Sequence, residues 1–206
     1  MQAVINSVLQ FFTYSVFAVG TQNVIFTRAL GLSNGLRMIN DTKKDIFYFC
    51  ISLTVFQLLN SLMAYFALPI LYSSPVSGYA RFLAPVVIVI GCAISYITVV
   101  FVLSLAADTR VFKSVIFSLT GSAINSAIVG TIIYSFNRGF NLPQTLGFAL
   151  GSSIGYFFAM LLINEGLNKI HDELVPEAFR GLPVTLVYIS ILALAVYALT
   201  GHSMAL

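Results

Sequence analysis

The residue types that usually carry metal or nucleophilic chemistry are few in this sequence and lie far apart. Its two cysteines, Cys50 and Cys92, each fall inside an apolar run and form no metal-ligand spacing. Thiols in such runs are typical of small buried hydrophobic side chains. Its two histidines, His171 in a polar connection and His202 near the C-terminus, are expected to be solvated. The sequence therefore predicts no catalytic constellation and no metal site.

Uncharged amides and hydroxyls inside the apolar segments are the remaining polar candidates. Asn23 and Asn125 lie within the first and fourth of these segments, near the expected middle of a membrane. Such groups either bridge helices, for about 0.6 kcal/mol each, or line a narrow aqueous path. Arg28 and Glu165 lie near helix ends, where Arg28 can reach water and Glu165 can pair or cap. The other polar candidates are Gln22, Gln57, Asn60, Ser126, Ser152 and Ser153.

The composition indicates that these side chains are carried by membrane-spanning elements. The chain has 206 residues, of which 59% are hydrophobic and only 8% charged. A soluble domain carries about 25% charged residues, because it needs a hydrated surface. The net charge of +3 comes from 10 basic and 7 acidic residues, too few and too scattered for a nucleic-acid patch. We therefore expect a partner in the lipid bilayer and none in nucleic acid.

Six apolar segments can be distinguished by run length. Each is long enough for a transmembrane helix, the structure that satisfies backbone hydrogen bonds within lipid. We predict an all-α polytopic membrane protein whose single transmembrane domain occupies residues 1–206 and leaves no room for a sizeable soluble domain. The helices are expected near 6–30, 45–72, 81–106, 111–136, 142–168 and 182–200.

The basic residues predict an orientation. Eight of the 10 Lys and Arg residues fall near the first, third and fifth connections, and only Arg81 and Arg138 fall near the second and fourth. Because cytoplasmic loops are enriched in basic residues, the odd-numbered connections should be cytoplasmic and both termini outside. The eight are Arg28, Arg37, Lys43, Lys44, Arg110, Lys113, Lys169 and Arg180.

Small residues predict close helix packing. Gly147, Gly151 and Gly155 form two overlapping GxxxG steps on the fifth helix. Such steps let backbones touch, either within the chain or at an interface with a second subunit. A similar stripe on the fourth helix comprises Ser122, Ser126 and Gly130. The asparagines of the first and fourth helices also indicate a 3+3 inverted repeat in which these two helices are interrupted.

Residues 175–201, VPEAFRGLPVTLVYISILALAVYALTG, resemble the C-terminal signature of the Rnf/Nqr membrane-subunit family. The branch they most resemble is RnfA/NqrE, whose outward termini agree with the predicted orientation. The likeness extends over essentially the whole chain. Further matching stretches are Asn23 to Arg28, Leu30-Gly31-Leu32, Thr42-Lys43-Lys44, Asn125-Ser126-Ala127 with Gly130, and Glu165.

The resemblance implies a role inside a larger complex. Members of this family pair with a homologous subunit, here one of the RnfE/NqrD type, inside a respiratory complex. That complex couples electron transfer between ferredoxin or quinone and nicotinamide nucleotide to sodium or proton transport. Each subunit of the pair supplies two cysteines from half-helices, and together they hold a 2Fe-2S cluster.

The sequence departs from the family at these ligand positions. Ser33 stands where the family has its first cysteine, Ser126 stands where it has the second, and Phe101 aligns with an acidic residue of the third helix. Serine hydroxyls stay protonated near neutral pH and lack the soft sulfur that iron–sulfur clusters need. Cys50 and Cys92 fall at neither position. We therefore predict a diverged member without a cofactor.

The sequence thus predicts a membrane subunit of an ion-translocating electron-transport complex. Its role would be to pair with a homologous subunit in a bacterial or archaeal cytoplasmic membrane and to shape a pathway for electrons or ions. Three alternatives remain open at this point. They are an electron-carrying iron–sulfur subunit, a stand-alone channel or transporter that uses Asn23 and Asn125, and a pure assembly protein.

Overall fold

The secondary structure is helical throughout the part of the chain that the computed structural model describes, residues 2–38, 43–75, 77–106, 118–170 and 175–200. The elements in chain order are α1 (Gln2–Val19), α2 (Val24–Arg28), α3 (Leu32–Arg37), α4 (Lys43–Ser73), η1 (Ser77–Tyr79), α5 (Ala80–Ala106), α7 (Ser126–Asn137), α8 (Leu142–Leu167), η3 (Glu177–Phe179) and α9 (Leu182–Thr200). A further helical stretch, residues 118–123, leads into α7. Residues 111–117 of the predicted fourth segment lie outside the described ranges.

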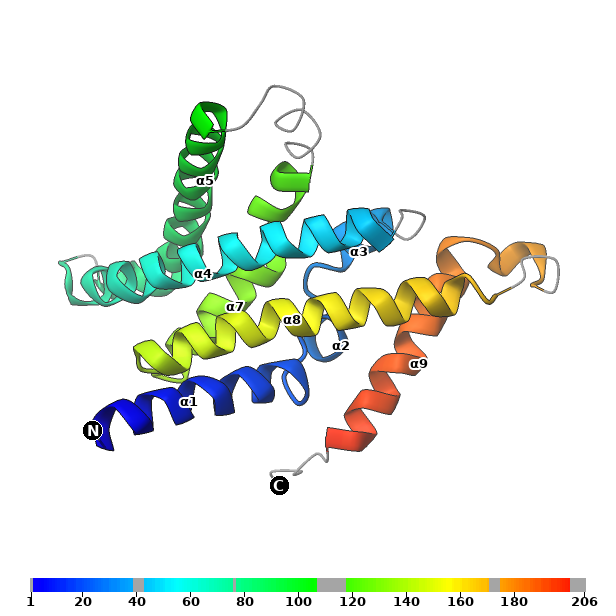
Figure 1. Cartoon of the computed structure of the whole chain (residues 1–206), viewed down its shortest axis with the longest axis horizontal. Coiled ribbons are helices and arrows are strands. Elements are labelled where there is room, and N and C mark those ends of the chain that lie inside the picture. The colour runs from blue at the N-terminus through cyan, green and yellow to red at the C-terminus, as the bar shows by residue number, and fades with distance from the viewer. Residues whose placement is uncertain (1, 39–42, 76, 107–117, 171–174, 201–206) are drawn as a thin grey trace.

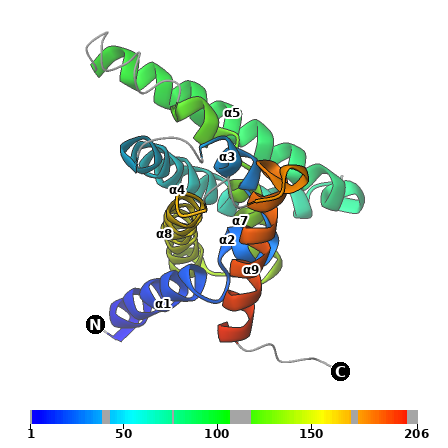
Figure 2. The same ribbon diagram turned by 90° about the vertical axis from the view of Figure 1, so that its right-hand side faces the viewer.

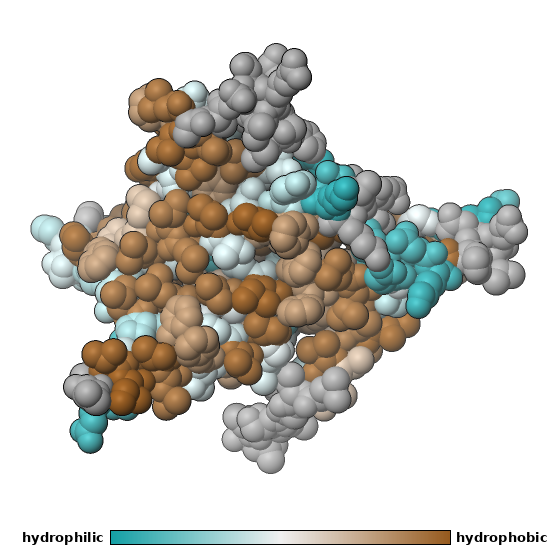
Figure 3. Space-filling view, viewed as in Figure 1, coloured by the Kyte–Doolittle hydropathy of each residue, from teal (hydrophilic) through white to brown (hydrophobic). Residues whose placement is uncertain are grey.

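Four helical segments are long and apolar enough to cross a membrane: Lys44–Ser73, Ser77–Leu105, Ser118–Asn137 and Leu142–Leu167. Two further apolar helices, Val4–Val19 and Leu182–Ala198, are shorter. Apolar side chains cover most of the face drawn in Figure 3, and hydrophilic ones gather mainly toward the end where α3 and the end of α8 lie. This surface suits lipid, so the chain is an α-helical membrane protein. The number six for its spans stays a prediction.

Helix α8 is the centre of the packing. It lies between α1 and α4 in the two perpendicular views of Figures 1 and 2, and α7 also packs against it. Its N-terminus is defined by a capping box, in which Asn141 and Gln144 exchange hydrogen bonds between side chain and backbone. Helix α5 packs mainly against α4 and is the least enclosed of the four spans. Helix α9 lies beside α2 and η3.

The glycine stripe of α8 lies against the backbone of α1. A Cβ atom on Gly147 would collide with the carbonyl of Phe11, and one on Gly151 would collide with the carbonyl of Ser15. The Ser15 hydroxyl donates to the Gly147 carbonyl at 2.9 Å, so a hydrogen bond accompanies the close approach. The stripe therefore makes a contact within the chain, with the two helices running parallel from Phe11 and Gly147 onward.

Two apolar segments are interrupted, at the two asparagines singled out from the sequence. In the first, α1 ends at Val19 and α2 begins after Asn23. In the fourth, residues 118–123 are helical and α7 begins after Asn125. Asparagine favours such positions, because its side-chain oxygen accepts from the free N–H groups at a helix start.

Candidate functional site

Asn23 holds the first interruption with both ends of its side chain. Its Oδ1 accepts from the backbone N–H groups of Ile25 and Phe26 at 3.1 and 3.3 Å, which caps α2. Its Nδ2 donates to the carbonyl of Gly155 at 2.9 Å and to that of Val19 at 3.3 Å. The amide is therefore buried, fully used, and bridges α2 to α8.

Asn125 caps α7 in a similar way but keeps one group unused. Its Oδ1 accepts from the backbone N–H of Ala127 at 2.9 Å. Its Nδ2 is buried and has no hydrogen-bond partner among the described residues. An unpaired buried amide costs about 1–3 kcal/mol, so this group is available to a further acceptor.

The two interruptions meet at Gly31. The backbone N–H of Gly31 donates to the Ser126 hydroxyl at 2.8 Å, and the buried Tyr156 hydroxyl donates to the Gly31 carbonyl at 2.9 Å. Gly31 has a φ of +76°, and a Cβ there would lie 2.6 Å from the Tyr156 ring and 2.8 Å from Asn125 Oδ1. The backbone angle and the crowding both require glycine at this position.

Two more contacts extend this junction. Asn34 Nδ2 on α3 donates to the Gly121 carbonyl at 2.8 Å. Leu30 fills the space above Gly130, where a Cβ atom would collide with its side chain. The small stripe predicted on the fourth helix therefore receives α2, α3 and the turn between them, within the same chain.

Ser33 and Ser126, the two positions at which the family carries cysteine, lie at this junction. Ser33 is exposed in the first turn of α3, two residues after Gly31, and Ser126 is exposed at the start of α7. Both hydroxyls therefore face the outside of this chain, on the side where a second subunit could approach.

The donor set at this junction does not fit an iron–sulfur cluster. The Ser126 hydroxyl already accepts from Gly31, and serine lacks a soft thiolate. Both thiols are buried elsewhere, Cys50 in α4 and Cys92 in α5, so neither could replace these serines. No group of three or more His, Cys, Asp or Glu side chains within the described ranges could hold a metal ion. His171 and His202 lie outside those ranges.

Arg28 lies at a place that sequence reasoning missed. Its Nη2 donates to Gln22 Oε1 at 2.6 Å, and its Cζ lies 4.0 Å from the centre of the Tyr134 ring on α7. Arg138 lies over the same ring at 5.4 Å. Arg28 therefore belongs with the fourth connection, which changes the predicted basic bias from eight against two to seven against three. Only a contact distant in sequence reveals this.

Several of the other polar candidates bridge helices. Asn60 Nδ2 on α4 donates to the Ser95 hydroxyl on α5 at 2.9 Å. The hydroxyls of Ser152 on α8 and Thr131 on α7 lie 3.0 Å apart. The remaining members are placed as follows: Gln57 Nε2 is buried without a hydrogen-bond partner among the described residues, Ser153 bonds to the Ala149 carbonyl, Glu165 lies in the last turn of α8, and Phe101 is exposed on α5.

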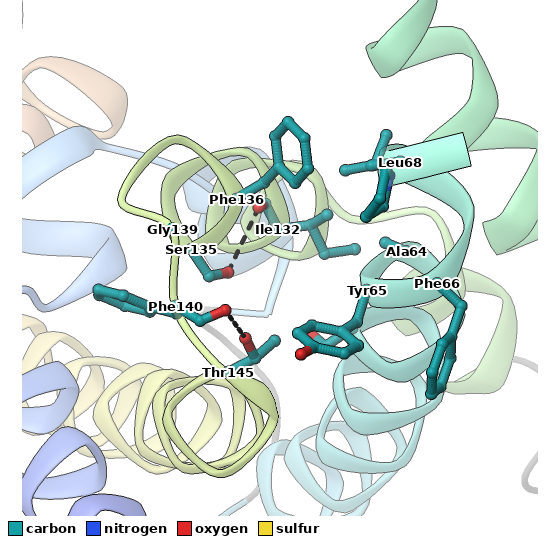
Figure 4. Close-up of a pocket in the computed structure, with 12 residues that line it drawn as sticks. Ala64, Tyr65, Phe66, Leu68, Ile132, Ser135, Phe136, Gly139, Phe140 and Thr145 are labelled. Atoms are coloured by element: carbon teal, nitrogen blue, oxygen red, sulfur yellow. Dashed lines mark hydrogen bonds between the residues drawn. The ribbon is translucent and has the colours of Figure 1, made fainter. Parts of the chain in front are cut away.

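A cavity of about 430 Å³ lies between α4, the end of α7 and the start of α8. Figure 4 shows its largely apolar lining, with the Tyr65 ring projecting from α4 toward Thr145. The hydroxyls of Ser135 and Thr145 bond to backbone carbonyls. The Ser61 hydroxyl also lines the cavity, but it is buried and no described residue offers it a hydrogen-bond partner. Sequence analysis did not single out this site.

The helical architecture, the apolar surface and the paired interruptions define the chain as a polytopic α-helical membrane protein. No family model matches it. Three relatives match in part. The NqrE-type subunit of the Na(+)-translocating NADH-quinone reductase of Shewanella denitrificans is 32% identical over 81 residues, 39% of this chain and 40% of the relative. The RnfA-type subunit of the ion-translocating oxidoreductase complex of Syntrophotalea carbinolica is 32% identical over 77 residues, 37% of this chain and 40% of the relative. The NqrE-type subunit of the Klebsiella pneumoniae reductase is 29% identical over 79 residues, 38% of this chain and 40% of the relative.

The chain is thus related to the RnfA/NqrE-like family of membrane subunits. The matches cover about two fifths of the length of these curated relatives.

Proposed function

We propose that this protein is a membrane subunit of an ion-translocating electron-transport complex, in which it pairs with a homologous subunit of the RnfE/NqrD type. The observation that carries the proposal is the junction of two interrupted helices, where Gly31 of the first bonds to Ser126 of the second. Inverted-repeat membrane proteins build sites from interrupted helices near the middle of the bilayer. The names of the partial relatives support the same class of complex.

The proposed topology has six spans in a 3+3 inverted repeat, with both termini outside the cytoplasmic membrane of a bacterium or archaeon. Helix α1 has 18 residues, about 27 Å, which approaches the hydrocarbon thickness of a bilayer. Helix α9 has 19 residues and a similar reach. The basic bias of seven against three still favours cytoplasmic odd-numbered connections.

We further propose that the protein works without a cluster of its own. Ser33 and Ser126 expose hydroxyls at the two ligand positions of the family, and a hydroxyl is a poor ligand for iron–sulfur clusters. The protein would then shape a pathway for electrons or ions that other parts of the complex carry. A stand-alone transporter and an assembly protein are the competing functions.

Purification of the tagged chain from its native membranes tests the proposal. We expect a homologous subunit to co-purify in equal amount, and we expect no iron that is stoichiometric with this chain. The Ser33→Cys, Ser126→Cys double variant restores this chain's half of a four-thiolate site, so it should gain iron only if the partner supplies two cysteines.

Three results would contradict the proposal. A monomeric chain without partners would refute its assignment to a complex. A reduced iron–sulfur signal by electron paramagnetic resonance, located between the wild-type chain and its partner, would refute the cluster-free role and favour an electron carrier. Ion flux in proteoliposomes that contain this chain alone would favour the stand-alone transporter, because a protein that only pairs with another should be silent.

A further inference from the structure

Tyr134 on α7 brings two cationic side chains together from distant parts of the sequence. Cζ of Arg28, in the last turn of α2, lies 4.0 Å from the centre of the Tyr134 ring. Cζ of Arg138, the C-cap residue of α7, lies 5.4 Å from the same centre. The two guanidinium groups are therefore no farther apart than these two distances taken together. Like charges this close repel, and the repulsion grows in surroundings of low dielectric constant.

Nothing described in the chain neutralises this pair. Arg28 bonds to the uncharged Gln22, and neither arginine has a carboxylate partner among the described residues. The ring face and the C-terminal ends of α2 and α7 stabilise positive charge in part. They leave the mutual repulsion in place. Each guanidinium carries five N–H donors, so donors beyond the bond to Gln22 remain for an anionic acceptor.

The depth of the pair in the membrane points to the kind of anion. Tyr134 lies three residues before Asn137, where α7 and its candidate span end, which is about 5 Å along the helix axis. The ring packs on Phe148 at a centroid distance of 5.0 Å and on Phe140 at 6.0 Å, so its base is apolar. An apolar base just inside the end of a span is the level at which hydrocarbon gives way to lipid headgroups.

We propose that Arg28, Tyr134 and Arg138 form a binding site for the phosphate group of an anionic phospholipid in the leaflet at the Asn137 end of α7. Guanidinium groups match phosphate oxygens with two parallel hydrogen bonds, and two arginines on one ring can bind one phosphate from both sides. The bound phosphate removes the repulsion between the two cations. This site requires neither a partner subunit nor electron transfer, so it does not depend on the proposed function.

Native mass spectrometry of the purified full-length chain tests the site. Wild-type protein is incubated with phosphatidylglycerol or with zwitterionic phosphatidylcholine, and the retained lipid is counted. We expect preferential retention of phosphatidylglycerol. Because a charge-assisted hydrogen bond contributes about 1.5–3 kcal/mol, Arg138→Gln and Arg28→Gln should each lower the apparent affinity about tenfold or more. Arg28→Lys keeps the charge but loses the planar fork, so its loss should be smaller.

Arg81→Gln is the matched control, because Arg81 is exposed near the start of α5, and its loss removes the same charge at the same predicted side of the membrane. Arg138 is also exposed, so Arg138→Gln should leave the size-exclusion profile unchanged. Equal retention by Arg138→Gln and Arg81→Gln would overturn the proposal. Displacement of phosphatidylglycerol by millimolar inorganic phosphate would overturn the lipid assignment in favour of free phosphate.

Discussion

Gly151→Ala should destabilise the protein, although alanine is the better helix former. The new methyl group would lie 2.7 Å from both the carbonyl carbon and the Cα of Ser15, so α1 would have to move away from α8. Forcing a methyl group into packed backbone costs about 1–3 kcal/mol. The movement would also strain the bond from the Ser15 hydroxyl to Gly147, which contributes about 0.5–1.5 kcal/mol. Replacing a helical glycine by alanine returns up to about 1 kcal/mol. We therefore expect a net loss of about 1–3 kcal/mol.

The assay is equilibrium unfolding of the purified protein in mixed micelles, followed by far-ultraviolet circular dichroism. Gly91→Ala is the matched control, because Gly91 also lies inside a long apolar helix and its Cβ would meet only Asn60 Oδ1, at 3.7 Å. We expect Gly91→Ala to be as stable as the wild type or slightly more stable. If Gly151→Ala were no less stable than Gly91→Ala, the close approach of α1 and α8 would be refuted. Gly151→Leu, which is bulkier, should prevent accumulation of assembled protein.

Three further predictions concern the junction, the cavity and the topology. Gly31→Ala should cost about 2–4 kcal/mol of unfolding free energy, whereas Gly181→Ala, with a similar φ of +78° and no atom within 4 Å of its Cβ, should cost only about 1 kcal/mol; equal losses in the same unfolding assay would mean that the Tyr156 contact is absent. Ser61→Ala should leave stability unchanged or raise it, because the lost hydroxyl has no described partner, whereas Thr131→Val should lose about 1 kcal/mol with its bonds to Ala127 and Ser152; a larger loss for Ser61→Ala would show that its hydroxyl is bonded. Reporter fusions in the odd-numbered connections should all report cytoplasm, and a periplasmic signal at any of these sites would contradict the orientation. The fusion sites are residues 40, 110 and 173.

Class and local breaks in this protein could be predicted from the sequence, because both depend on neighbouring residues. A chain that is 59% hydrophobic and 8% charged has no other way to satisfy its backbone than helices in lipid. The interruptions at Asn23 and Asn125 are also local, because an asparagine caps the helix that starts directly after it. The glycine spacing on α8 indicated a close contact for the same reason, since three residues one turn apart share one face.

What those local features meet was decided only by the tertiary structure. The α8 stripe is compatible with any small-surfaced helix, and packing alone selects α1 and places Ser15 against Gly151. Gly31 and Ser126 are joined across most of the chain, which no periodicity reveals. Arg28 shows the difference most clearly. Its position in the sequence assigns it to the first connection, but the fold carries α2 back against α7 and places its charge over Tyr134 beside Arg138. Hydropathy and capping act over a few residues, whereas the energy of a cation over a ring or a hydroxyl on a distant amide depends on which helices lie side by side.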